Sequence, residues 1–94
     1  MSIEVVDQPD RRRYEAVVDG VVGGSAHYEL DGDTMTFTHT EVDDEFEGQG
    51  VGSELVRRVL DDVRERGLRI VVRCPFIRSW IERHPEYRDL TAPG

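Results

Sequence analysis

The sequence predicts a single α+β domain whose elements follow the order ββββαβα, with helices packed on a mixed β-sheet. Alternating polar and apolar residues, broken by turn residues, fill the first half of the chain and indicate antiparallel strands. Apolar residues then recur at helical spacing. A short β-branched run and a second helical pattern complete the order. Ninety-four residues suffice for one hydrophobic core and not for two, so residues 1–94 are predicted to form one domain.

Four consecutive strands are predicted in the first half of the chain. They cover residues 2–7, 12–18, 21–30 and 34–42. Turn residues rich in Asp, Gly and Pro separate them at positions 9–10, 19–20 and 31–33. Tyr14, Ala16 and Val18 share one parity, as the buried face of a strand requires, and the same holds for Ala26, Tyr28 and Leu30.

The second half of the chain changes to helical spacing. A helix of about four turns is predicted from residues at this spacing, and Gly67 ends it. These residues are Val51, Leu55, Val56, Val59, Leu60 and Val63. The run "LRIVVRC" predicts a fifth strand, parallel to the fourth by the usual crossover rule. After Pro75, a second helix is predicted to gather on one side Phe76, Ile77, Trp80, Ile81 and His84.

Composition excludes several classes of protein. A net charge of −8 argues against nucleic acid as a partner, because a polyanion is repelled by an acidic surface. No apolar run approaches the roughly 18 residues of a membrane span, and the polar start is not a signal peptide, so we expect a cytoplasmic protein without a membrane partner. The single cysteine, Cys74, cannot form an internal disulfide or hold zinc by itself, and no metal is expected. Oligomeric state is not readable from the sequence.

Three glycines stand at alternate positions just before the first predicted helix, in "EGQGVGS". Such glycines let backbone N–H groups approach an anion, and the helix adds its own unpaired donors. A Walker loop needs a lysine, and the chain has none. A dinucleotide fingerprint starting at Gly48 needs glycine where Ser53 stands, and it opens the first βαβ unit rather than following four strands. The remaining alternatives are a glycine-rich turn without ligand and an anion site of another kind.

The segment "VDDEFEGQGVGSELV" resembles the pyrophosphate loop of the GNAT superfamily of acyl-CoA-dependent N-acetyltransferases, whose pattern is Arg/Gln-x-x-Gly-x-Gly/Ala. The resemblance implies that backbone amides of the loop hold the pyrophosphate of CoA. The implied residues are Gly48, Gln49, Gly50, Val51, Gly52 and Ser53. The first position of the motif departs from the family, because Glu47 replaces Arg or Gln. A carboxylate there weakens phosphate binding unless it points to solvent or bonds to a loop amide.

A second, narrower resemblance covers about residues 14–87. "THTEV", the glycine loop and "RCPFIRSWIERHPEY" are similar to very short GNAT-type acetyltransferases, which lack the N-terminal helices of longer members. In that subgroup the implied catalytic residues are a His on the strand before the loop and a Cys on the strand after it, here His39 and Cys74. His39 shares parity with Met35 and Phe37, so we expect it on the packed or ligand-lined side of the sheet.

The resemblance implies a direct transfer of acetyl from acetyl-CoA to an amine. His39 suits the role of base, and Cys74 suits proton donation to the CoA thiolate or, less simply, transient acceptance of the acetyl group. If the fourth and fifth strands splay apart, the backbone of Thr40, Glu41 and Val42 is expected to hold the pantetheine arm, with one N–H polarising the thioester carbonyl.

Other readings of the same residues stay open. A lone cysteine is commonly a small core residue, and a strand histidine is commonly structural. Tyr87 is an alternative acid, and the CoA 3′-phosphate has candidate partners in Arg57, Arg58, Arg78 and Arg83. The acceptor, a small-molecule or a protein amine, is not identified by the sequence. The second hypothesis for function is a module that binds CoA or acyl-CoA without turnover.

Overall fold

The computed structural model describes residues 2–91 and contains a five-stranded sheet in the order β1-β2-β3-β4-β5. Its strands are β1 (Ile3–Gln8), β2 (Arg13–Val18), β3 (Val21–Asp31), β4 (Thr34–Val42) and β5 (Arg69–Val72). Its helices are α1 (Val51–Glu65) and α2 (Pro75–Arg83), with short 3-10 turns η1 (Pro9–Arg11), η2 (Asp44–Phe46) and η3 (Pro85–Leu90). The first four strands are antiparallel, and β5 lies parallel to β4. The predicted α+β fold with order ββββαβα, including this parallel pair, is confirmed.

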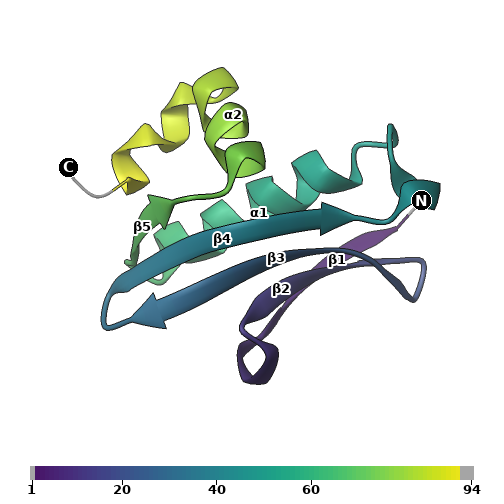
Figure 1. Ribbon diagram of the computed structural model, residues 1–94, viewed down its shortest axis with the longest axis horizontal. Coiled ribbons are helices and arrows are strands. Elements are labelled where there is room, and N and C mark those ends of the chain that lie inside the picture. Colours follow the sequence, from purple (N-terminus) through teal and green to yellow (C-terminus); the bar gives the residue numbers. More distant parts are fainter. Residues whose placement is uncertain (1, 92–94) are drawn as a thin grey trace.

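Local turn chemistry explains the long antiparallel meander. In the tight turn between β2 and β3, Asp19 and Gly20 both have positive φ, of 49° and 87°. Two central residues of positive φ form the turn whose twist matches that of paired strands, and Asp-Gly is a preferred sequence for it. The strands curve beneath α1, which runs along one face of the sheet (Figure 1). The opposite face of the sheet is called the outer face.

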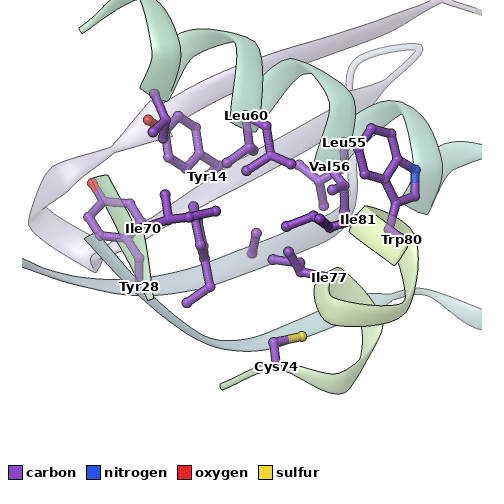
Figure 2. Close-up of a cluster of buried hydrophobic side chains, with 14 of the residues drawn as sticks. Tyr14, Tyr28, Leu55, Val56, Leu60, Ile70, Cys74, Ile77, Trp80 and Ile81 are labelled. Carbon is purple, nitrogen blue, oxygen red and sulfur yellow. The ribbon is translucent and has the colours of Figure 1, made fainter. Parts of the chain in front are cut away.

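The core lies between the inner face of the sheet and the two helices. Tyr14, Ala16 and Val18 point into it from β2, and the predicted apolar stripe of α1 is fully buried. Ile77, Trp80 and Ile81 contribute from α2, as Figure 2 shows. Leu30 and Phe76, which were predicted on buried sides, are instead 46% and 41% exposed. Leu30 is the second-to-last residue of β3, next to the turn into β4. Phe76 lies in the first turn of α2, where it lines a cavity.

A β-bulge in β4 changes which side chains face the core. Tyr28 pairs with Phe37, but the preceding residue, His27, pairs with His39, so Thr38 is an extra residue. Because side chains alternate with a period of two, one inserted residue moves every later side chain to the other face. The parity predicted for His39 is therefore wrong: it lies on the outer face, opposite Met35 and Phe37. Thr40, paired with the buried Ala26, returns to the inner face.

Side chains close the C-terminal end of α1 against the sheet. Tyr14 donates its hydroxyl to Asp62 at 2.6 Å, and Tyr28 donates to Asp7 at 2.5 Å. Arg66 donates to Tyr14 at 3.0 Å and to Asp7 at 3.2 Å. Burial, followed by the bond to Asp62, raises the pKa of Tyr14 well above its usual value, and burial with the bond to Asp7 does the same for the pKa of Tyr28. Both tyrosines therefore stay protonated as donors.

Candidate active site

Strand β4 runs on beyond the end of its neighbour β5, which is paired over its whole length. The last paired residues are Phe37 and Val72, and the Arg73 N–H still donates to the Phe37 carbonyl at 2.9 Å. Strand β4 continues to Val42, so its residues 38–42 have no β5 partner. The open edge beside β4 therefore arises because β5 is short, and the two strands do not splay apart within their paired length.

The open edge of β4 offers backbone groups to this gap. The Asp43 N–H donates to the Gly23 carbonyl of β3 at 2.8 Å, so it points away from β5. Backbone groups of alternate strand residues point in opposite directions. The amides of Thr40 and Val42 therefore point into the gap between the strands, whereas that of Glu41 points toward β3.

The three glycines of the loop have different physical roles. Gly48 and Gly50 have φ of 78° and 83°, and a Cβ atom on either would meet open space. Backbone conformation is what selects glycine at these two positions. Gly52 lies inside α1, and its selection is steric: a Cβ there would stand 2.8 Å from Phe76 Cζ and 3.2 Å from Val42 Cγ2. The alternation thus combines a left-handed turn with a close approach of helix, strand and aromatic ring.

The N-terminal end of α1 keeps its backbone donors free. Glu54 is the first residue to use the helical ladder, donating to the Gly50 carbonyl at 3.0 Å, and no side chain among residues 2–91 caps the helix. Within residues 2–91, the N–H groups of Val51, Gly52 and Ser53 therefore have no protein acceptor. Their positive partial charge favours an anion at this position. The Gln49 N–H is instead used by the turn, donating to the Phe46 carbonyl at 3.3 Å.

A cavity of about 420 Å³ connects the loop, the helix N-terminus and the open edge of β4. Its walls are formed by Thr40, Val42, Phe46, Glu47, Gly48, Gly50, Val51, Gly52, Ser53 and Phe76. Phe46 and Phe76 escaped the sequence prediction, because aromatic residues were assigned to the core or to the turn. The signal for Phe76 was its place one residue after Pro75, in the first turn of a helix that starts where β5 leaves β4.

Glu47 lines the cavity, as its motif position predicts, and its exposed side chain makes no hydrogen bond or ion pair with residues 2–91. Its backbone N–H donates to the Asp44 carbonyl at 3.2 Å. Of the two arrangements that would make this carboxylate compatible with phosphate, only the solvent-directed one agrees with the structure. A carboxylate at the mouth still reduces the attraction of the cavity for an anion.

Cys74 and His39 approach the gap from different sides of the sheet. Cys74 is 2% exposed and precedes α2; Figure 2 shows it at the periphery of the core cluster. Its Sγ lies 3.2 Å from Thr40 Oγ1, a contact that spans from the end of β5 to β4. His39 is on the outer face with 60% of its side chain exposed, and its Nε2 lies 3.0 Å from Glu41 Oε1. The structure thus joins Cys74 to Thr40, and His39 to Glu41.

The other candidates have structural partners. Tyr87 donates to Asp61 at 2.7 Å, and this bond together with burial raises the pKa of Tyr87. Arg57 stacks over the Trp80 ring, with Cζ 5.6 Å from its centroid, and Arg58 pairs with Glu54 at 2.7 Å. Arg78 and Arg83 donate to backbone carbonyls of Val72 and Ser79. None of these residues belongs to the cavity wall formed within residues 2–91.

Comparison with known proteins decides the family. The model of the GCN5-related N-acetyl-transferase family matches residues 13–90, which is most of the chain. The chain belongs to this family. Protein NATD1 of Xenopus tropicalis is 30% identical over 86 residues, covering 89% of this chain and 79% of that protein. Protein NATD1 of Bos taurus is 38% identical over a shorter stretch, 50% of this chain and 42% of its own length.

Solved structures agree with the family assignment. A GCN5-like protein from Staphylococcus aureus, determined by NMR in solution, has a TM-score of 0.72 at 26% identity, with 97% of this chain and 89% of that chain covered. The ribosomal-protein-S18-alanine N-acetyltransferase of Escherichia coli has a TM-score of 0.61 at 16% identity over 76% of this chain and 64% of that chain, so it shares the fold. The expected resemblance to the GNAT superfamily is confirmed.

Two further properties of residues 2–91 bear on the site. No three or more His, Cys, Asp or Glu side chains in this part of the chain are placed to hold a metal ion together. Neither of its helices has the length and apolar character that a membrane crossing demands.

Proposed function

We propose that this chain is an acetyl-CoA-dependent N-acetyltransferase that transfers acetyl directly to an amine. One observation carries the proposal: in a member of the GCN5-related family, a cavity joins unpaired amides at the start of α1 to the open edge of β4. The residues suit the shape and charge of CoA. The amides of Val51, Gly52 and Ser53 would hold the pyrophosphate, and Gly48 and Gly50 leave room for it.

Along β4, the chain offers strand-like hydrogen bonds to an extended arm. The backbone of Thr40 and Val42 would pair with the amides of pantetheine in the gap that β5 leaves open. Phe76, exposed beside Gly52, would cover the arm with an apolar surface. Acetyl-CoA, when bound, supplies the activated thioester.

The proposed chemistry divides between two faces of the sheet. His39, exposed on the outer face, would accept the proton that the amine loses as its nitrogen bonds to the acetyl carbon. Cys74, buried beside Thr40, would return a proton to the thiolate released when the C–S bond breaks. Enclosure of Cys74 leaves little room for an acetyl group on its sulfur, which supports direct transfer over an acetyl-cysteine intermediate.

The acceptor is a small-molecule or a protein amine, and the acidic balance of the chain favours a cationic one by steering its encounter. From its charge and composition, we place the protein in the cytoplasm and expect neither nucleic acid nor a membrane as its partner.

The test measures free CoA released from acetyl-CoA across a panel of amines. We expect turnover in the wild type, a large loss in His39→Ala, and a smaller loss in Cys74→Ser, which keeps a hydroxyl donor, than in Cys74→Ala. Calorimetry with CoA should give the same dissociation constant for all four proteins. Unchanged turnover in both alanine variants would remove the proposed roles.

A second candidate function is a CoA or acyl-CoA binding module without turnover. The specific observations in its favour are Glu47 at the mouth of the cavity and the position of His39 on the opposite face from Cys74. Binding of acetyl-CoA without release of free CoA for any amine would support the module. Turnover with a single amine excludes it.

A further inference from the structure

The outer face of the sheet carries two rows of polar side chains that both end at β4 beside the gap. In the first row, Arg13 of β2 pairs with His27 of β3, which pairs with His39 of β4. In the second row, Glu15 pairs with Ser25, which pairs with Glu41. Paired residues share a face, so these six side chains form one continuous polar strip.

Within the strip, the carboxylate of Glu41 lies near two imidazoles, those of His39 and His27. Glu41 Oε1 lies 3.0 Å from His39 Nε2, and Glu41 Oε2 lies 4.0 Å from His27 Nε2. The two rings stand 5.9 Å apart between centroids. Ser25 Oγ, 3.3 Å from His27 Nε2, restrains the second ring. Glu41 therefore lies between the imidazole of His39 on its own strand and that of His27 on β3.

The neighbouring charges leave Glu41 to the histidines. Arg13 is bound by Glu15 at 2.6 Å, and Arg11 reaches the same carboxylate at 3.5 Å. No ion pair between an arginine and Glu41 occurs in the part of the chain that the structure describes. When His39 is protonated, the carboxylate that pairs with it is consequently that of Glu41.

An ionised carboxylate only accepts hydrogen bonds, so the nitrogen of His39 that faces Glu41 must carry a proton. In the neutral ring this fixes the proton on Nε2 and leaves the lone pair on Nδ1. Nδ1 is the ring nitrogen nearer to its own backbone. A base must present a lone pair to the proton that it removes, and this tautomer does so.

We propose that Glu41 is the positioning residue of the acetyl transfer, holding His39 in the Nε2–H tautomer and stabilising its protonated form. The inference rests on the proposed function. As the amine nitrogen bonds to the acetyl carbon and the C–S bond breaks, the amine proton passes to Nδ1 of His39, and the thiolate takes a proton from Cys74. The resulting imidazolium is paired with Glu41 and returns its proton to water because the ring is exposed, and Cys74 regains a proton from water before the next turnover.

The first experiment does not depend on turnover. Histidine ring nitrogens are observed by 15N NMR across a pH titration of the full chain, for the wild type, Glu41→Gln and Glu4→Gln. Glu4 is an exposed carboxylate on β1, three strands from His39, so its removal matches the change in net charge. We expect Glu41→Gln to raise the Nδ1–H fraction of neutral His39, because the carboxylate that holds the proton on Nε2 is gone. Glu4→Gln should leave this fraction unchanged.

The second experiment measures kcat and KM with an amine that is turned over. Glu41→Gln should lower kcat roughly threefold, the loss expected when an exposed ion pair to the imidazolium is removed, with KM unchanged. The dissociation constant for CoA should not change. A merely structural role would alter stability or KM and leave kcat as it is.

The two failures are distinguishable. Equal Nδ1–H fractions of His39 in the wild type and Glu41→Gln overturn the role of Glu41, whatever the turnover. A raised Nδ1–H fraction in Glu41→Gln together with absent turnover for every amine retains the Glu41–His39 pair and overturns the proposed function instead.

Discussion

Helix α1 meets a cavity at each end, and the two cavities differ in what they present. Near its N-terminus, about 420 Å³ is bordered by backbone donors, two aromatic rings and the single carboxylate of Glu47. Toward its C-terminal half, a second cavity of about 300 Å³ borders α1 and β1. It is lined by Val5, Asp7, Tyr14, Arg58, Asp61, Asp62 and Glu65. Four carboxylates and one arginine repel phosphate, so only the first cavity suits CoA.

The same contrast separates binding from stability. At the C-terminal end, Tyr14 donates a hydrogen bond to Asp62 and accepts one from Arg66. The Leu68 N–H donates to the Val63 carbonyl at 3.1 Å. At the N-terminal end, three amides keep no protein acceptor within residues 2–91. A helix end without a cap costs stability, typically about 1 kcal/mol. The unsatisfied end is where a ligand gains most, and the satisfied end holds the helix in place.

The largest effect is expected for Gly50→Asp. A carboxylate would stand beside the free amides of α1, and like charges brought together cost several kcal/mol, so the dissociation constant for CoA should rise roughly 100-fold or more. Calorimetry measures it, with circular dichroism to verify the fold. Gly50→Ala adds the strain of positive φ without the charge and should have the smaller effect. Equal affinities in wild type and Gly50→Asp would contradict the anion site.

Tyr14→Phe should act at the other end only. It removes a largely buried hydrogen bond to a carboxylate, so the free energy of unfolding should fall by about 1.5–2 kcal/mol. Thermal denaturation would register this as a lower Tm, at about 4–8 °C per kcal/mol. The affinity for CoA should stay the same. A Tyr14→Phe protein with normal Tm and weakened CoA binding would reverse the division between the two ends.

The contribution of the Tyr14 hydroxyl to stability should depend on pH in the alkaline range. The pKa of Tyr14 is raised in the folded chain, so the unfolded chain releases this proton first and the stabilisation is lost above pH ~10. At pH 10.5 the stability lost in this way is roughly 0.8 kcal/mol. Tyr14→Phe should therefore lose less stability than the wild type between pH 9 and 10.5, measured by urea denaturation. Parallel losses in the two proteins would mean that Tyr14 titrates normally in the folded state.

Glu47→Gln is expected to have the smallest effect. It removes one exposed carboxylate from the mouth of the cavity and restores a residue found at this position in the family motif. Exposed charge pairs are worth about 0.2–1 kcal/mol, so CoA should bind roughly two- to fivefold more tightly. Glu45→Gln, in the same acidic turn, is the matched control and should bind as the wild type does. Weaker binding in Glu47→Gln would assign this carboxylate a supporting role.

Local patterns were enough to predict the order of elements. Asp19 and Gly20, the stripe on α1 and the β-branched run of β5 each follow one period or one turn type. The family was predicted from the resemblance of "VDDEFEGQGVGSELV" to the GNAT motif, and the place of this loop after the fourth strand agreed with that resemblance.

The prediction for His39 was wrong because of the register between β3 and β4. Nothing in "TMTFTHTEV" marks Thr38 as an extra residue, because the bulge arises from pairing with β3. The contact of Cys74 with Thr40 and the exposure of Phe76 likewise depend on how α2 starts relative to β4. Periodicity predicts the face of a side chain only where the hydrogen-bond ladder between strands is regular. This site lies beside the β-bulge at Thr38, where the ladder is irregular.

The central claim is that the N-terminal end of α1 holds the pyrophosphate of CoA. Amide 1H–15N shifts followed during a titration with CoA test it most directly, because both ends of the helix report in one spectrum. We predict saturable shifts that are largest at Gly50, Gly52 and Ser53, with Asp61 and Asp62 nearly unchanged. Absence of shifts at millimolar CoA, or shifts centred on Asp61 and Asp62, would contradict the account.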